Sequence, residues 1–146
     1  MKKILIAAVL LLSVSYASIA GNTKTIDPKT LAAFSKEFST ASNVSWQEES
    51  SFSKATFTIN GSVLFAYYST NGELIASSRN ISSTQLPLHL FTTLKNDYNS
   101  YWITDLFELA VNDTTEYYVT LENAGEKRIL RSNSYGWEMF DSVIKD

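Results

Sequence analysis

The sequence predicts an α+β fold built as a tandem repeat, in which each unit is one helix followed by a four-stranded antiparallel meander. Three observations support this prediction. Apolar residues recur at helical spacing in two segments, 28–41 and 83–98. Apolar and polar residues alternate in the segments that follow each of them. Asn-Gly pairs, which favour hairpin turns, separate alternating segments. We expect both helices to pack on one face of a continuous antiparallel sheet.

The first twenty residues are typical of a cleaved secretory signal. Lys2 and Lys3 precede an apolar run from Ile4 to Leu12, and small residues stand at Ser18 and Ala20. The run is shorter than the ~20 apolar residues that a membrane anchor needs. We expect cleavage after residue 20, with position 17 as the alternative. We then expect residues 21–146 to form a single domain that inserts into no membrane.

Composition limits the classes of partner. The whole chain has 12 basic and 15 acidic residues, and removal of Lys2 and Lys3 leaves 10 − 15 = −5 for residues 21–146. This acidic balance argues against nucleic acid as a partner. The chain has no cysteine, so it forms no disulfide and lacks the acylated cysteine of a lipoprotein. We expect a bacterial protein of the periplasm or exterior that is stabilised by packing alone.

The first unit covers about residues 27–80. Asp27 and Pro28 form a helix start, because Asp caps free amide groups and Pro lacks the amide that the first position leaves unpaired. Leu31, Phe34 and Phe38 follow at helical spacing and predict a helix over 28–41. Alternation and two Asn-Gly turns then predict four strands, at 44–49, 53–59, 62–69 and 73–79.

The second unit, about residues 84–144, repeats this order. Pro87 suits a first helical turn, and Phe91, Leu94 and Tyr98 give one apolar face, so we expect a helix over 83–98. Four strands are predicted to follow it, near 102–111, 115–122, 127–133 and 137–143.

A constant offset of 60 residues relates the two units. Phe34 precedes Leu94 by this offset, and Trp46 precedes Leu106. Matches in both helix and strand predict an internal duplication. No segment rich in glycine or proline separates the units, so we expect their strands to join in one sheet.

Short motifs follow one another in a recognisable order along about residues 30–142. They are Asn43-Val44-Ser45-Trp46, Ala55-x-Phe57, Ala66-x-Tyr68, Asn71-Gly72-Glu73-Leu74, Leu86-Pro87 and Tyr117-x-Val119-x-Leu121. This order resembles the exported PepSY-like domains. The resemblance implies a fold similar to that of the beta-lactamase inhibitor protein and an inhibitor-like or partner-binding role. It carries over no catalytic residue.

The sequence offers little material for catalysis. His89 is the only histidine and cysteine is absent, so transition-metal sites and histidine-activated nucleophiles lack their usual residues. Glu48 and Glu49 are neighbours in a predicted strand, and Asp105 and Glu108 are three residues apart, so the members of each pair point to opposite faces. We therefore expect no enzyme, no metal and no cofactor, and carboxylate catalysis ranks only as a third hypothesis.

One face of the predicted sheet mixes threonine with aromatic and β-branched residues. A two-residue turn at 60–61 pairs position 59 with 62 and 57 with 64, which assigns the hairpin residues to two faces. The set expected opposite the helices is Thr56, Thr58, Val63, Phe65 and Tyr67, joined through the repeat by Tyr118 and Thr120. Aromatic side chains on such a face can anchor a protein partner.

Our preferred hypothesis is an exported, non-enzymatic module that binds an unidentified protein or peptide of the cell envelope through this face. Alternatively, a loop, a terminus or a second copy of the chain covers the face, or its residues only reflect strand propensity. A second functional hypothesis is a periplasmic carrier of a small apolar ligand between helices and sheet. Under the first hypothesis, serine at Phe65, Tyr67 and Tyr118 together should abolish binding and leave thermal unfolding nearly unchanged.

Overall fold

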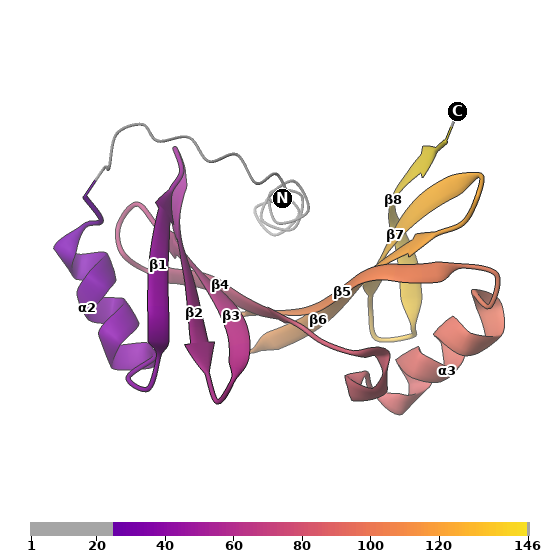
Figure 1. The fold of residues 1–146 in the computed structure, drawn as a ribbon, viewed down its shortest axis with the longest axis horizontal. Coiled ribbons are helices and arrows are strands. Elements are labelled where there is room, and N and C mark those ends of the chain that lie inside the picture. Colours follow the sequence, from indigo (N-terminus) through magenta and orange to yellow (C-terminus); the bar gives the residue numbers. More distant parts are fainter. Residues whose placement is uncertain (1–24, 146) are drawn as a thin grey trace.

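The computed structural model describes residues 25–145, which form a single antiparallel sheet of eight strands in the order β1 to β8 (Figure 1). Its elements are α2 (Pro28–Glu37), β1 (Ser42–Glu48), β2 (Phe52–Ile59), β3 (Ser62–Ser69), β4 (Leu74–Asn80), the 3₁₀ turn η1 (Ser83–Gln85), α3 (Leu88–Asp97), β5 (Trp102–Val111), β6 (Thr114–Glu122), β7 (Glu126–Ser132) and β8 (Trp137–Ile144). The predicted signal lies outside the described residues.

The predicted tandem repeat, with both helices packed on one face, is wrong. The described chain is mostly one eight-stranded sheet, and its two α-helices lie at opposite ends of that sheet (Figure 1). Adjacent strands rotate by roughly 20–25°, so the two ends face different directions and the helices form no common layer. The offset of 60 residues also relates unlike positions, since Trp46 lies on edge strand β1 and Leu106 is buried on inner strand β5.

Both helices begin near the predicted proline signals, but they are shorter than expected. The Asp27 side chain accepts a hydrogen bond from the Lys29 amide at 2.7 Å, as the predicted cap requires. α2 ends at Glu37 rather than at position 41. α3 does not extend back to position 83, because the residue before a proline avoids helical dihedrals and Leu86 adopts φ −67° and ψ 150°.

The strand predictions are confirmed, with bounds that differ from the structure by at most two residues. The first Asn-Gly hairpin has the predicted register, in which Ile59 pairs with Ser62. Its turn residues Asn60 and Gly61 both have positive φ, at 49° and 78°. A two-residue turn of this kind matches the twist of the strands it joins. The turn residues alone therefore determine how β2 and β3 pair, and the sequence was sufficient to predict this register.

Three clusters of buried side chains make up the core. The cluster beside α2 contains Phe34, Ala55, Phe57, Ala66 and Tyr68. The cluster beside α3 contains Ile81, Leu86, Leu90, Leu94, Leu106, Val119, Leu121 and Leu130. A third, central cluster contains Tyr67, Ala76, Phe107, Leu109, Val111 and Tyr118, with Phe52, Phe65, Ile75 and Phe140 packed against it. No residue of α2 or α3 belongs to this central cluster, and all of its members lie on strands.

Gly72, in the turn between β3 and β4, fixes how this turn meets α2. Its φ is +81°, and a Cβ there would lie 3.1 Å from the Thr30 backbone nitrogen and 3.2 Å from Lys29 Cβ. Gly61 has a similar φ of +78°, but a Cβ there would meet no atom within 4 Å. The two glycines therefore share one backbone requirement, and only Gly72 also lacks space for a side chain.

We expect Gly72→Ala to lower the free energy of unfolding by about 2–4 kcal/mol, since left-handed strain costs about 1–2 kcal/mol and crowding about as much again. The matched control Gly61→Ala should cost only about 1–2 kcal/mol. Chemical denaturation of both variants measures the difference. Equal losses would contradict the close contact between this turn and the start of α2.

Candidate binding surface

The sheet register places the predicted site residues on one surface, which we call the Phe65 face. On adjacent strands β2 and β3, Thr56 pairs with Phe65 and Thr58 pairs with Val63. Thr56, Thr58 and Phe65 are partly buried, and the side chain of Val63 is 51% exposed. These residues form the accessible part of the Phe65 face.

Pairing across β4 and β5 continues the Phe65 face to Tyr118. Phe65 pairs with Ser78, and Ser78 pairs with Leu109. Phe107, two residues from Leu109, pairs with Tyr118 on β6. The predicted extension of this face from the first half of the chain to the second is therefore present in the register.

Three predicted site residues are buried rather than accessible. Tyr67 is 5% exposed, Tyr118 is 1% exposed, and Thr120 is also buried. Burial raises the pKa of Tyr67 to about 12 and, with Glu116, raises that of Tyr118. Serine at Tyr67 and Tyr118 would remove core contacts, so we now expect the triple serine variant to unfold at a lower temperature, contrary to the sequence-based expectation. Their role in partner binding stays a prediction.

Aromatic contacts hold the base of the Phe65 face in place. The rings of Tyr118 and Phe107 stack with centroids 5.2 Å apart and an interplanar angle of 6°. The ring of Phe140 on β8 meets Tyr118 edge-on at 5.5 Å. The Tyr118 hydroxyl donates a hydrogen bond to Glu116 Oε2 at 3.0 Å. This packing gives the exposed residues of the face a rigid support.

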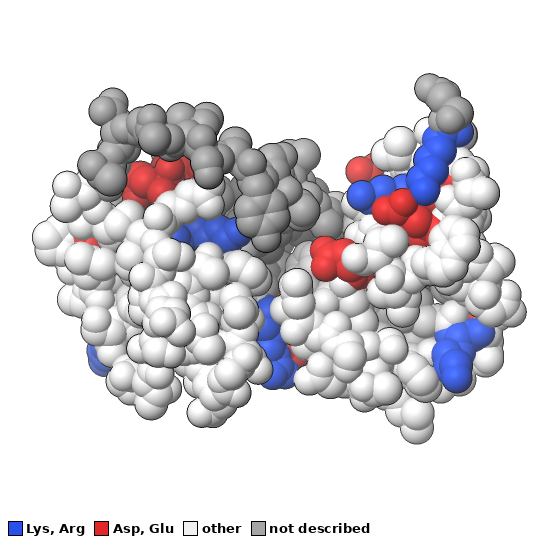
Figure 2. Space-filling model, viewed as in Figure 1, with Lys and Arg blue, Asp and Glu red and all other residues white. Residues whose placement is uncertain are grey.

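On the side of the molecule that Figure 2 shows, the charged side chains of the described residues do not gather into a large patch of one sign. Figure 2 shows a mostly uncharged surface on the viewed side, with acidic and basic groups scattered over it. Among the described residues, charged side chains on neighbouring strands form ion pairs, as Arg79 Nε does with Glu108 Oε1 at 2.6 Å and Arg131 does with Glu138. The hydrogen bond from Arg131 holds the pKa of Glu138 below its usual range. Such a surface suits a protein partner better than a polyanion.

The carboxylates that the sequence offered for acid-base chemistry do not converge. Asp105 pairs with Thr120 and Glu108 with Tyr117, which places the two acids on opposite faces as predicted. Burial raises the pKa of Asp105, but Glu108 is bound to Arg79. Within residues 25–145, no three residues among His, Cys, Asp and Glu lie close enough to hold a metal ion.

Two surface hollows give no support to the carrier hypothesis. One, of about 690 Å³, is lined by Ser100, Trp102, Asn123, Ala124, Gly125, Glu126 and Ile144. The other, of about 300 Å³, is lined by Asn80, Ile81, Ser82, Ser83, Ile103, Thr104, Asp105 and Leu106. Both are open to solvent, and neither is lined by a residue of α2 or α3, as a ligand cavity between helices and sheet requires.

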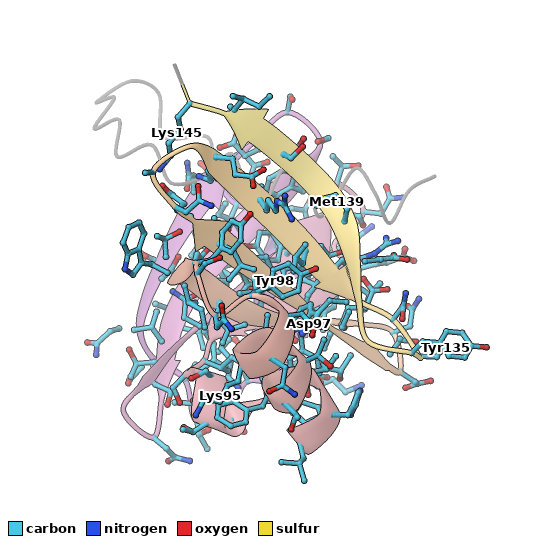
Figure 3. All side chains as sticks on the ribbon, turned by 90° about the vertical axis from the view of Figure 1, so that its right-hand side faces the viewer. Lys95, Asp97, Tyr98, Tyr135, Met139 and Lys145 are labelled. Atoms are coloured by element: carbon cyan, nitrogen blue, oxygen red, sulfur yellow. The ribbon has the colours of Figure 1, made fainter. Side chains whose placement is uncertain are left out.

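Tyr135 is an exposed aromatic residue that the predicted site did not include. It lies in the turn between β7 and β8 and projects away from the rest of the molecule (Figure 3). The residue is 97% exposed, and Asn133 Oδ1 accepts a hydrogen bond from its backbone amide at 2.8 Å. No registered strand pair places Tyr135 on the Phe65 face, so it provides a control for experiments on that face.

In the part of the chain that the structure describes, no helix is long and apolar enough to cross a membrane. No protein-family model matches the chain, and no curated protein matches its sequence.

Solved structures of Bacteroides proteins are similar to this chain. A DUF2874 family protein from Bacteroides uniformis has a TM-score of 0.72 and 15% identity, and the match covers 82% of this chain and 90% of that one. A BLIP-like protein from Bacteroides fragilis has a TM-score of 0.70 and 20% identity, with 84% and 89% covered. A protein from Bacteroides eggerthii, named among "putative periplasmic proteins", has a TM-score of 0.71 and 12% identity, with 81% and 88% covered.

At these identities the similarity concerns the fold alone. It supports the expected beta-lactamase-inhibitor-like fold, since one of these proteins is called BLIP-like. It does not point to the PepSY-like domains specifically, and that resemblance stays a prediction. The chain thus has the fold of a group of Bacteroides proteins that includes a BLIP-like protein.

Proposed function

We propose that the chain is an exported, non-enzymatic module that binds a protein or peptide of the cell envelope through the Phe65 face. The observation that carries the proposal is the combination of the exposed Val63 and the partly buried Phe65 with a buried aromatic base at Tyr67 and Tyr118. A surface that is already ordered loses little entropy when a partner binds. An accessible aromatic side chain contributes a large contact area to such an interface.

The periplasm or the exterior of a bacterial cell is the proposed location. The lysine pair and the apolar run at the start of the sequence support export. The name of the Bacteroides eggerthii neighbour supports a periplasmic location, and the name of the BLIP-like neighbour supports an inhibitor-like role.

The proposal is tested with the exported protein immobilised and exposed to an envelope extract of its own cell. A specific partner should be retained by the unchanged protein, and Phe65→Ser should reduce its retention about tenfold or more, as expected for an aromatic anchor worth about 2 kcal/mol. Tyr135→Ser, which removes an exposed aromatic residue elsewhere, should leave retention unchanged.

Thermal unfolding of the same variants separates loss of binding from loss of folding. Phe65 is only partly buried, so Phe65→Ser should leave a folded protein with a modestly lower Tm. If the Phe65→Ser variant still retains the partner and the Tyr135→Ser variant does not, the partner binds at the β7–β8 turn. This result would contradict the proposal.

A further inference from the structure

Lys54 lies on the Phe65 face with its ammonium group over two aromatic rings. It is partly buried on β2, where it pairs with Tyr67 across the ladder. Its Nζ lies 4.7 Å from the centroid of the Phe65 ring and 5.9 Å from that of Tyr67. Both distances are within the range in which a ring face attracts a cation. The aromatic rings therefore hold the ammonium group at a defined position on the face.

Lys54 also differs from the other cations of the described strands, because each of them pairs with a carboxylate and Lys54 forms no ion pair with another described residue. The four others pair as Arg79 with Glu108, Lys127 with Glu122, Arg128 with Glu126 and Arg131 with Glu138. No carboxylate of the described residues lies within 4.0 Å of Lys54 Nζ. Glu49 is close enough to act on Lys54, but its Oε1 accepts a hydrogen bond from Gln47 Nε2 at 3.1 Å.

The surroundings of Lys54 favour the arrival of an anion. Burial lowers the pKa of Lys54 below its ordinary value of 10.5, and the opposing effect of Glu49 is smaller. The ammonium group has thus lost part of its hydration without gaining an ion pair, and this loss costs free energy. A carboxylate placed against it would form a charge-assisted hydrogen bond and restore the lost stabilisation.

We propose that Lys54 binds a carboxylate side chain in an acidic peptide segment of the partner, while a neighbouring apolar side chain of that segment packs on Phe65. This inference rests on the proposed function and adds the chemistry of the partner. The lysine sets the position of the acidic residue, and Phe65 and Val63 supply the apolar contact beside it. The partner is thus a peptide segment that combines Asp or Glu with an apolar residue.

The test is a selection of random displayed peptides on the exported protein, followed by affinity measurements with the selected peptides. Peptides that bind the Phe65 face are identified as those that bind the unchanged protein but not the Phe65→Ser variant. We expect them to contain Asp or Glu next to an apolar residue. Replacing that acid by Asn or Gln in the peptide should weaken binding about tenfold to a hundredfold, the range for hydrogen bonds between charged groups.

Two variants of Lys54 complete the test. Lys54→Met keeps the length of the side chain and removes the charge, so it should weaken the binding of the acidic peptides by the same factor. It should not further weaken the binding of peptides whose acid has been replaced by Asn or Gln. Lys54→Arg keeps the charge and should retain most of the affinity. Thermal unfolding confirms that both variants are folded.

The outcomes distinguish this inference from the proposed function. Peptides that lose binding with Phe65→Ser but lack an acid, or that bind Lys54→Met unchanged, would overturn the role of Lys54 and leave the Phe65 face as the binding surface. If no selected peptide loses binding with Phe65→Ser, both proposals fail.

Discussion

Replacing Tyr118 by alanine should lower the free energy of unfolding by about 3–5 kcal/mol, the range for large aromatic residues removed from a core. The side chain is 1% exposed, stacks on Phe107 and meets the ring of Phe140 edge-on. Its removal opens a cavity in the central cluster, to which neither α2 nor α3 contributes a residue. Such a loss is a large part of the 5–15 kcal/mol that stabilises a typical domain. Chemical denaturation measures it directly.

Tyr118→Phe is the matched control, because it keeps the ring and removes only the hydroxyl that donates to Glu116. It should cost about 0.5–1.5 kcal/mol, the net value of one hydrogen bond. If alanine and phenylalanine at this position cost the same small amount, the central cluster does not contribute to the core in the way that its burial indicates.

Replacing Phe34 by alanine should have a similar effect at the α2 end of the sheet, with a loss of about 3–5 kcal/mol. Phe34 is the buried aromatic residue through which α2 contacts the strands. Its ring centroid lies 5.0 Å from that of Phe57, 5.2 Å from that of Trp46 and 6.5 Å from that of Tyr68. Without these contacts α2 loses its main attachment, because a helix of 10 residues is marginal alone.

Leu31 provides the comparison for Phe34 on the same helix. Its side chain is 41% exposed, so Leu31→Ala should cost less than about 1 kcal/mol. Denaturation curves of the two variants, with the far-ultraviolet signal as a second probe, report the difference. A larger loss at Leu31 than at Phe34 would mean that α2 packs on the sheet through another face.

Local chemistry was sufficient to predict most of the elements. Asn60 and Gly61 have the positive φ values that their turn requires, and the register of β2 and β3 follows from that turn. Asp27 caps α2 because its carboxylate reaches an amide two residues ahead. In each case the residues that decide the structure are neighbours in the sequence, which is why a pattern in a short window can predict it.

The arrangement of the elements depended on pairing that no short window contains. The contact between β4 and β5 makes β5 an inner strand, whereas β1 remains at the edge. Trp46 and Leu106 therefore occupy different environments although they match in type and spacing. The twist of the sheet, summed over eight strands, also separates the helices that the sequence prediction placed in one layer.

The sequence predicted which residues share the candidate surface, but it did not predict which of them are exposed to solvent. Alternation assigned Phe65, Tyr67 and Tyr118 to one face, and the strand pairing agrees. It could not indicate that Tyr67 and Tyr118 are buried, because this depends on packing between distant strands. Lys54 was missed, although alternation places it on the same face, since a lysine in a strand is usually a solvated residue.

The most direct test of binding through the Phe65 face is photo-crosslinking in the living cell. A photoreactive residue is placed at Val63, which is 51% exposed on that face, or at Leu88, which is 78% exposed at the start of α3. We predict that position 63 crosslinks to a specific partner, that position 88 does not, and that Phe65→Ser removes the crosslink. A partner that crosslinks at position 88 and never at position 63 would contradict the proposed binding surface.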